Sequence, residues 1–389
     1  MGTVSPGALR VMQVMECTIG GTRRHLTDVA RGLRERGVEV HLVVAAERQP
    51  AFRESLRELQ TLGCLVHEIP MSRGIAPLQD MRQIAQLKKI LRVIQPDIVH
   101  THSSKAGVIG RLASLRTGIG KRVHTPHTFA FLFHEMFGPL KRALFYRIEK
   151  HLAGSTHALI AVSPGEAQTF ESSGIVSSEK IQVVQNGIDP EPFVAARPAN
   201  LVELGLDPER PIAAVVGLLN IAKGQDLALQ ALASPAISKD LQLMVVGHGE
   251  TLGELKSLAR SLGVEERVAF LGFREDVPEL LAASDFLLLP SRWEGMPYIV
   301  IEAMAAGLPV VATPVDGARD LVQPNKTGVL AADSTSDAIA KALEHFMGLS
   351  SSEQKSMGEL GRQRALKSFT RDTMVDELCE LYRAMLQRD

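Results

Sequence analysis

The sequence predicts an α/β protein made of two doubly wound, Rossmann-like parallel-sheet domains that face each other across a cleft. Short apolar runs alternate with longer amphipathic stretches, and this alternation stops once in a turn-rich segment and then restarts. Continuous apolar runs, each followed by a helical pattern, indicate parallel strands that are covered on both faces. The length of 389 residues fits two domains, because a domain typically has roughly 100–200 residues.

The N-terminal half shows this pattern from its first apolar run. Residues 9–15 predict a buried strand, and residues 23–36 predict an amphipathic helix. Further strands are expected at residues 38–45, 98–101, 122–125 and 158–163. Because ligands of such sheets bind at the carboxyl ends of the strands, the residues that follow each strand are candidates for a functional site.

The alternation breaks at residues 185–190, where Asn-Gly and Asp-Pro are turn signals and a proline-rich connection follows. Strands are expected again at residues 211–217, 241–247, 268–271, 286–290 and 310–313. The tail from Ser350 onward has a purely helical pattern. We therefore predict domains at residues 1–187 and 188–368, with a hinge near residues 186–192. A C-terminal helix at residues 369–389 could pack back on the N-terminal domain.

Composition and charge argue against several classes of protein. The formal net charge is -1, whereas a dedicated nucleic-acid binder needs a basic face. Cys17, Cys64 and Cys379 lie far apart, without the ligand spacing of a zinc site or of a disulfide framework. No apolar run approaches the roughly 20 residues of a membrane span. We expect a cytoplasmic protein that could touch the inner face of the cell membrane.

The segment at residues 290–307 carries the most specific pattern for chemistry. Gly295 and Pro297 suit a tight turn that opens a helix, whose amides can bind phosphate. Glu294 precedes this turn, and Glu302 lies about one turn into the helix, leaning back toward its start. Two carboxylates beside such a turn suit a ligand with a diphosphate between two polyhydroxyl rings. The alternative is an ordinary helix start, with a surface glutamate and one that complements the helix dipole.

Here a family resemblance enters. Glu294 and Glu302 have the E-x7-E spacing of retaining glycosyltransferases with the GT-B fold, and residues 290–312 resemble the family 4 pattern PSxxEGxPxxxxEAMAxGxPVVA almost throughout. The similarity extends to shorter segments at residues 20–21, 100–107, 186–189, 223–224 and 246–250. It covers essentially the whole chain and is closest to the type that builds bacterial envelope and capsule polysaccharides.

The resemblance implies how the two domains share the reaction. Residues 1–187 would bind the acceptor, and residues 188–368 would bind a nucleotide-sugar donor, with a UDP-sugar favoured. The enzyme would be a retaining hexosyltransferase that needs neither a metal nor a cofactor. Its acceptor would be a saccharide or a polyprenyl-linked saccharide. A nucleotide-sugar epimerase or hydrolase, or a non-catalytic nucleotide-sugar-binding protein, is the alternative.

The resemblance also assigns the donor side. Glu302 would hold the nucleotide ribose and Glu294 the hydroxyls of the transferred sugar, with Gly295, Met296 and Pro297 forming the phosphate-binding turn. Lys223 would act on the diphosphate as a catalytic cation. The site would also include Gly249, after another strand.

One position departs from the family pattern. An arginine that normally accompanies the lysine is replaced by Leu218. A lysine alone neutralises charge but cannot bind two oxygens as an arginine fork does. Arg274 or Arg292 could supply the missing cation.

Two candidates lie in the N-terminal half. Gly20 and Gly21 follow the first strand, where glycine lets amides approach a phosphate, and by resemblance they face the donor phosphates. No acidic residue ends the second strand, so an NAD-binding reading is weak, while a structural turn stays an alternative. His127 follows the strand at residues 122–125, and family members carry a histidine there facing the transferred sugar. It is the candidate catalytic residue of this domain.

Two further histidines, His100 and His102, are expected to support or pack against this site. No metal site is expected from them and His127, since no carboxylates accompany them. The stretch at residues 129–150 gathers aromatic and basic side chains in a chain poor in aromatics. Such an element suits an anionic membrane surface, and a core helix with a solvated basic face is the alternative.

Overall fold

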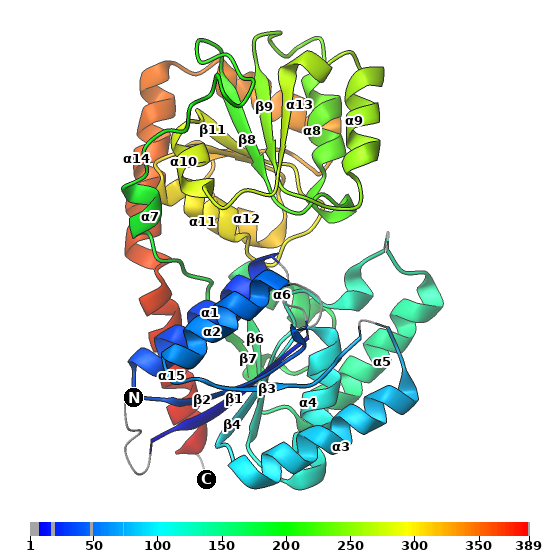
Figure 1. Cartoon of the computed structure of the whole chain (residues 1–389). Coiled ribbons are helices and arrows are strands. Elements are labelled where there is room, and N and C mark those ends of the chain that lie inside the picture. The colour runs from blue at the N-terminus through cyan, green and yellow to red at the C-terminus, as the bar shows by residue number, and fades with distance from the viewer. Residues whose placement is uncertain (1–7, 17–19, 47–49, 73, 135, 388–389) are drawn as a thin grey trace. The chain divides into compact units, whose positions relative to one another are not determined.

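The computed structural model describes residues 8–16, 20–46, 50–72, 74–134 and 136–387, and the chain forms two compact units (Figure 1). Unit 1 comprises Met1–Asn186 and Arg371–Asp389, and unit 2 comprises Gly187–Thr370. The chain therefore leaves unit 1 inside the Asn-Gly turn and re-enters it before the last helix. No described helix is both long and apolar enough to cross a membrane.

Unit 1 is built on a parallel sheet of seven strands in the order β3-β2-β1-β4-β5-β6-β7. The strands are β1 (Arg10–Met15), β2 (Glu39–Val44), β3 (Leu65–Glu68), β4 (Ile98–His102), β5 (Lys121–Thr125), β6 (Ala158–Ala161) and β7 (Ile181–Val183). The order reverses between β1 and β4, which is the switch point where doubly wound sheets bind ligands at their carboxyl edge.

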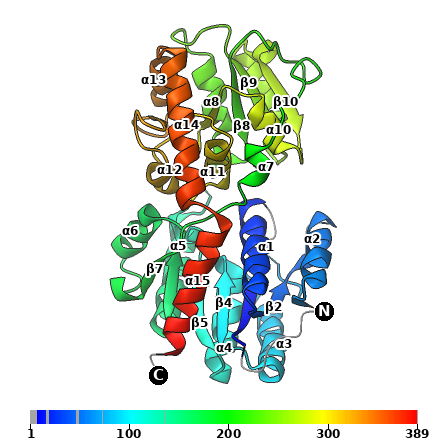
Figure 2. The ribbon, with the colours of Figure 1, turned by 90° about the vertical axis from the view of Figure 1, so that its left-hand side faces the viewer.

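Helices cover both faces of this sheet. They are α1 (Gly20–Glu35), α2 (Pro50–Thr61), α3 (Pro77–Ile94), α4 (Ser104–Thr117), α5 (Pro139–Ser155), α6 (Pro164–Ser172) and α15 (Arg371–Leu386), with short 3-10 turns η2 (Ala130–Leu132) and η3 (Ser178–Lys180). Alternate residues of β1 pack against α1, α2 and α15 on one face and against α3 and α4 on the other. Helix α15 lies beside α1 (Figure 2), so the C-terminal end of the chain completes the core of unit 1.

Unit 2 repeats the design with six parallel strands in the order β10-β9-β8-β11-β12-β13. The strands are β8 (Ile212–Val216), β9 (Gln242–Val246), β10 (Val268–Gly272), β11 (Phe286–Leu289), β12 (Val310–Ala312) and β13 (Gly328–Leu330). Its switch point lies between β8 and β11, so the loops that follow these two strands leave the same edge side by side.

The helices of unit 2 again cover both faces of the sheet. They are α7 (Glu191–Val194), α8 (Gln225–Leu232), α9 (Leu252–Ser261), α10 (Val277–Ala282), α11 (Tyr298–Ala305), α12 (Asp316–Leu321), α13 (Ser336–Met347) and α14 (Ser351–Ser368), with η4 (Ile221–Lys223) and η5 (Glu265–Arg267). Helices α8, α9 and α13 share one apolar core with the sheet, and α11 packs on α14.

The predicted fold class is confirmed, and the differences concern short elements. Strands β3, β7 and β13, which have only three or four residues each, were not predicted. Strands β3 and β7 are largely half-exposed or exposed, so they lack the continuous apolar run by which the other strands were predicted. The first helix begins at Gly20 rather than at residue 23, because the glycine pair opens the helix instead of preceding it.

Candidate functional site

An ion pair joins two of the predicted site residues at the carboxyl edge of unit 2. Lys223, at the end of η4 after β8, donates from Nζ to Glu294 Oε1 at 2.5 Å. Ser291 Oγ donates to the same carboxylate oxygen at 2.9 Å. The Glu294 side chain is 11% exposed and that of Lys223 27%. The loops after β8 and β11 thus hold a cation and a carboxylate together, with part of the lysine open to solvent.

Several contacts fix the loop that carries Glu294. Thr313 Oγ1 donates to the Ser291 carbonyl at 2.5 Å. The Arg292 amide donates to the Ala222 carbonyl at 2.8 Å, which ties this loop to η4. Because hydrogen bonds to the backbone hold this loop and join it to the segment that carries Lys223, the position of the Lys223–Glu294 pair does not depend on two flexible side chains alone.

The turn after Glu294 opens helix α11. Gly295 is half-buried, Met296 and Pro297 are buried, and Pro297 precedes the first residue of the helix. Glu302 is the fifth residue of α11, and it is buried with 7% exposure. A carboxylate with so little exposure is costly unless it is paired or hydrogen-bonded, and α11 has no acidic residue in its first turn, where the alternative interpretation placed a glutamate that complements the helix dipole.

Glycines allow three loops to meet at this edge. A Cβ atom on Gly249, after β9, would lie 2.1 Å from the Leu219 carbonyl oxygen, and one on Gly224 would lie 2.0 Å from that of Pro290. Real side chains do not fit at such distances, so only glycine permits this packing. The predicted residue Gly249 therefore shapes the edge where Lys223 and Glu294 meet.

The two arginines considered as substitutes at the Leu218 position are both engaged in ion pairs. Arg292 contacts Asp226 through two nitrogens at 2.8 and 2.6 Å. Arg274 contacts Asp276 in the same way, at 2.8 and 2.5 Å. The Leu218 side chain is half-buried, and its carbonyl accepts a hydrogen bond from Gln225 Nε2 at 3.0 Å.

In unit 1, the predicted glycine pair and His127 lie at the carboxyl edge. Gly20 and Gly21 are exposed at the start of α1, and Gly20 has a φ of 59°. His127 follows β5 and, like Thr128, is left-handed, with φ angles of 50° and 75°. Two consecutive non-glycine residues in this region are strained and need the surrounding structure to hold them.

The residue that holds this strained turn was not among the predicted site residues. The buried carboxylate of Glu166, in α6, accepts the Thr128 amide at 2.8 Å and the Val162 amide at 2.8 Å. One side chain thus fastens the residue after His127 to the end of β6. Nothing in the local sequence separates Glu166 from an ordinary acidic residue in the first turn of a helix.

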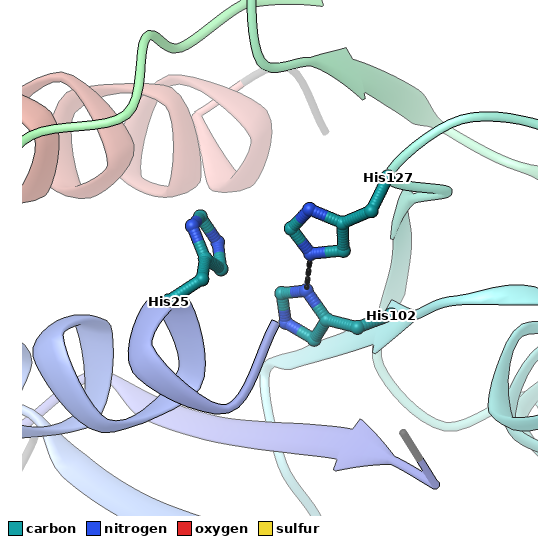
Figure 3. A group of neighbouring side chains, drawn as sticks. All are labelled: His25, His102 and His127. Atoms are coloured by element: carbon teal, nitrogen blue, oxygen red, sulfur yellow. Dashed lines mark hydrogen bonds between the residues drawn. The ribbon is translucent and has the colours of Figure 1, made fainter. Parts of the chain in front are cut away.

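His127 lies in a group of histidines drawn from three elements (Figure 3). His25 comes from α1 and His102 from the end of β4, and one ring nitrogen of each of the three lies within 4.8 Å of the others. His102 Nδ1 is 3.3 Å from His127 Nε2. Sequence reasoning missed His25 because it is 77 residues from His102 in the chain, in a helix taken only as a sheet cover.

Burial makes these imidazoles neutral at pH 7. It lowers the pKa of His25 to about 4, against the opposing effect of a hydrogen bond with Asn186. Burial also lowers the pKa of His102 and of His127 well below the usual range, and neighbouring histidines add to this effect. A neutral imidazole has one nitrogen that donates and one that accepts, so the group offers lone pairs rather than positive charge.

A buried chain of hydrogen bonds connects His102 to the C-terminal helix. Gln13 Oε1 accepts from His102 Nε2 at 2.6 Å, and Gln13 Nε2 donates to the hydroxyl of Tyr382, in α15, at 3.1 Å. The Tyr382 hydroxyl donates to His100 Nδ1 at 2.6 Å, and His100 Nε2 donates to Thr125 Oγ1 at 2.8 Å. His100 is therefore buried and held by hydrogen bonds at both ring nitrogens.

Known proteins resemble this chain over nearly its whole length. The family described as Glycosyltransferase Family 4 matches residues 19–192, and Glycosyl transferases group 1 matches residues 196–364. An Escherichia coli relative, UDP-Gal:alpha-D-GlcNAc-diphosphoundecaprenol alpha-1,3-galactosyltransferase, is 32% identical over 80% of this chain and 81% of its own. D-inositol 3-phosphate glycosyltransferase from Salinispora tropica is 28% identical over 93% of this chain and 80% of its own.

Solved structures share the fold at lower identity. HepE of Anabaena, in complex with UDP and glucose, has a TM-score of 0.80 at 23% identity, covering 97% of this chain and 100% of that one. Sucrose-phosphate synthase of Thermosynechococcus elongatus has a TM-score of 0.81 at 19% identity, covering 98% and 100%.

Two Rossmann-like units with these residues at their carboxyl edges define a glycosyltransferase of the GT-B class. The relatives place it further: the chain belongs to glycosyltransferase family 4. It is an enzyme of the hexosyltransferase type that uses a nucleotide-sugar donor.

Proposed function

We propose that this enzyme transfers a sugar from a UDP-sugar to a lipid-linked saccharide, with retention of configuration at the anomeric carbon. The observation that carries the proposal is the Lys223–Glu294 pair beside the opening of α11, in a family 4 chain. The E. coli relative is named for a UDP-sugar donor and a diphosphoundecaprenol-linked acceptor. Structures of HepE in complex with UDP and with UDP-glucose support the same choice of nucleotide.

Different residues of unit 2 bind different parts of the donor. Lys223 Nζ has three protons, of which one is directed at Glu294, so the others can meet the diphosphate. Glu294 accepts hydroxyl protons of the transferred sugar, and Glu302, in α11, accepts those of the ribose. Gly295, Met296 and Pro297 form the turn whose amides approach the phosphates, and Gly249 leaves room for them.

Transfer needs no protein nucleophile in this scheme. The bond between the anomeric carbon and the phosphate oxygen breaks, and the acceptor oxygen attacks from the same face. The acceptor proton passes to the departing phosphate oxygen, while Lys223 and the amides stabilise the charge that develops on the diphosphate. His127 and the glycine pair at Gly20 and Gly21 contribute from unit 1, with His127 positioning the transferred sugar.

The acceptor would reach the enzyme at a membrane surface, through a face that we call the α5 patch: Met136, Phe137, Leu140, Lys141 and Leu144. Leu140 is 88% exposed, and Lys141 Nζ lies 4.5 Å from the centre of the Phe137 ring. Apolar and basic side chains at the start of a helix and in the turn before it, most of them exposed, suit the interface of an anionic membrane. The nearby aromatics Phe129 and Phe131 are buried in the core instead, so only part of the aromatic stretch is available.

Two measurements test the donor and the stereochemistry. A calorimetric titration with UDP, GDP, ADP and dTDP should show the tightest binding for UDP. NMR of the product formed from an α-linked UDP-sugar should show an α-linkage, and a β-linkage would refute retention. The same assay without acceptor separates transfer from hydrolysis or epimerisation.

Transfer should persist in excess EDTA, and complete loss restored by Mg²⁺ or Mn²⁺ would show that the enzyme needs a metal.

A separate measurement tests the membrane surface. Sedimentation with vesicles containing anionic phospholipids should capture the wild type, and Leu140→Glu with Leu144→Glu should reduce the bound fraction. Val93→Glu, at an 84% exposed position on α3, is the matched control. Equal binding of all three proteins would rule out the α5 patch as the contact.

A further inference from the structure

We propose that His25, His102 and His127 form a Zn²⁺ site in unit 1, with one coordination position open to a ligand. The three side chains come from α1, β4 and the turn after β5, and each directs a nitrogen toward a common point (Figure 3). Convergence of three imidazoles from separate elements is the arrangement of an open zinc site, in which three protein ligands leave a fourth position for water or another ligand.

The spacing of two of the nitrogens already suits a shared metal ion. Zinc binds histidine nitrogen at about 2.0–2.1 Å, so two nitrogens on a tetrahedral ion lie about 3.3 Å apart. His102 Nδ1 and His127 Nε2 are separated by 3.3 Å. The third nitrogen lies within 4.8 Å of both, so a small rotation of the His25 ring would complete the site.

Neighbouring oxygens set the tautomers that a metal needs at His102 and His25, whereas His127 Nε2, which donates to His102 Nδ1 in this structure, would have to give up its proton to the ion. Gln13 Oε1 can only accept, so His102 donates from Nε2 and keeps the lone pair on Nδ1, toward the common point. Asn186 Oδ1 likewise accepts from His25 Nδ1 at 3.1 Å, so a metal would be bound through Nε2. Metal-binding histidines typically donate their other nitrogen to such an oxygen, which fixes the ring.

The ligand set indicates the kind of ion. Among the residues that the structure describes, the group contains three imidazoles and neither carboxylate nor thiolate. Imidazole nitrogen suits Zn²⁺ and other late first-row ions rather than Mg²⁺ or Ca²⁺, which prefer oxygen. A zinc ion here would take up His127 Nε2. If His127 positions the transferred sugar, as the proposed function has it, Zn²⁺ would therefore inhibit transfer.

Titration of Zn²⁺ into EDTA-stripped, tag-free full-length protein tests the site. We expect one equivalent to bind, and His25→Ala or His127→Ala to abolish this binding. Gln13→Met keeps the size of the side chain but removes the oxygen that holds His102, and should weaken binding about 10–100-fold. His345→Ala, a change at a surface histidine of α13, is the control and should bind like the wild type. Thermal melting of each variant confirms folding.

Two further experiments test which residues bind the ion. Cys17 lies outside the described residues and its thiol can bind zinc, so Cys17→Ser should retain the site. Co²⁺ in place of Zn²⁺ should give the visible absorption of a four-coordinate ion, lost in His25→Ala. Absence of stoichiometric binding, or binding unchanged in both His25→Ala and His127→Ala, would overturn the proposal. Binding without inhibition would leave the metal site standing and count against the role of His127.

Discussion

The two units present opposite kinds of chemistry at equivalent edges of their sheets. In unit 2 the edge carries a partly exposed charged pair, Lys223 and Glu294, beside a helix start. In unit 1 the edge carries neutral imidazoles, from the buried His25 and His102 and the half-buried His127. The first can match a diphosphate and sugar hydroxyls by charge, while the second can only offer lone pairs and donors. The fold therefore fixes where a site forms, and the side chains placed at that edge decide its chemistry.

The two edges also differ in how they are assembled. Glu294 and Glu302 stand eight positions apart in one loop and helix, and a backbone hydrogen bond from Arg292 ties that loop to η4. The histidine group draws on three elements and depends on residues beyond them, including Gln13 and Asn186. Changes in unit 2 should therefore act on the donor directly, and changes in unit 1 should act through geometry.

Removing the cation of unit 2 should have the largest effect. In Lys223→Ala, the departing diphosphate loses its ammonium, and Glu294 keeps only Ser291 of its two described donors. Loss of such a stabilising group typically costs about 10²–10³-fold in kcat. Steady-state kinetics measure the change, with Lys326→Ala, an exposed lysine of the same unit, as control. A decrease below about tenfold would mean that another cation carries this role.

The two glutamates should separate binding from turnover. Glu302→Ala should lower the affinity for UDP, because a charged acceptor of the ribose is lost, at a cost of about 1.5–3 kcal/mol. Glu294→Ala should lower kcat while UDP affinity changes little, because its proposed partner is the transferred sugar. Calorimetry with UDP and kinetics with the UDP-sugar give both quantities. Equal UDP affinity in the wild type and Glu302→Ala would contradict the assignment.

Removing the carboxylate that holds the turn after His127 should affect unit 1 and leave nucleotide binding unchanged. In Glu166→Ala, the amides of Thr128 and Val162 lose their described acceptor, and an unsatisfied buried group costs about 1–3 kcal/mol. We expect a lower melting temperature and a lower kcat, with UDP affinity unchanged. Glu171→Ala, at an exposed position of the same helix, is the control. Weaker UDP binding in Glu166→Ala alone would break the proposed division between the units.

The same difference between the two edges explains which features could be predicted from the sequence. The segment at residues 290–307 is continuous, so its turn, its helix and both glutamates could be located from spacing alone. The partnership of His25 with His102 and His127 could not, because it arises only when α1 is laid beside β4 and the turn after β5. Short, half-exposed strands such as β3 could not be predicted for another reason, since no apolar run marks them.

The smallest effect is expected at Leu218, where the family pattern has an arginine. Arg292 and Arg274 form ion pairs with Asp226 and Asp276. Neither arginine therefore already supplies the positive charge that an arginine at position 218 would bring to a phosphate. Leu218→Arg should therefore tighten UDP binding. Because the position is half-buried and open to solvent screening, we expect only about 0.2–1 kcal/mol, up to about fivefold. Turnover need not rise, since tighter product binding can slow release.

Leu218→Met, which adds no charge, is the control, and Asp226→Asn releases Arg292 from its ion pair. Calorimetry with UDP compares them: no tightening in Leu218→Arg, together with tightening in Asp226→Asn, would show that Arg292 is the residue that can reach the diphosphate.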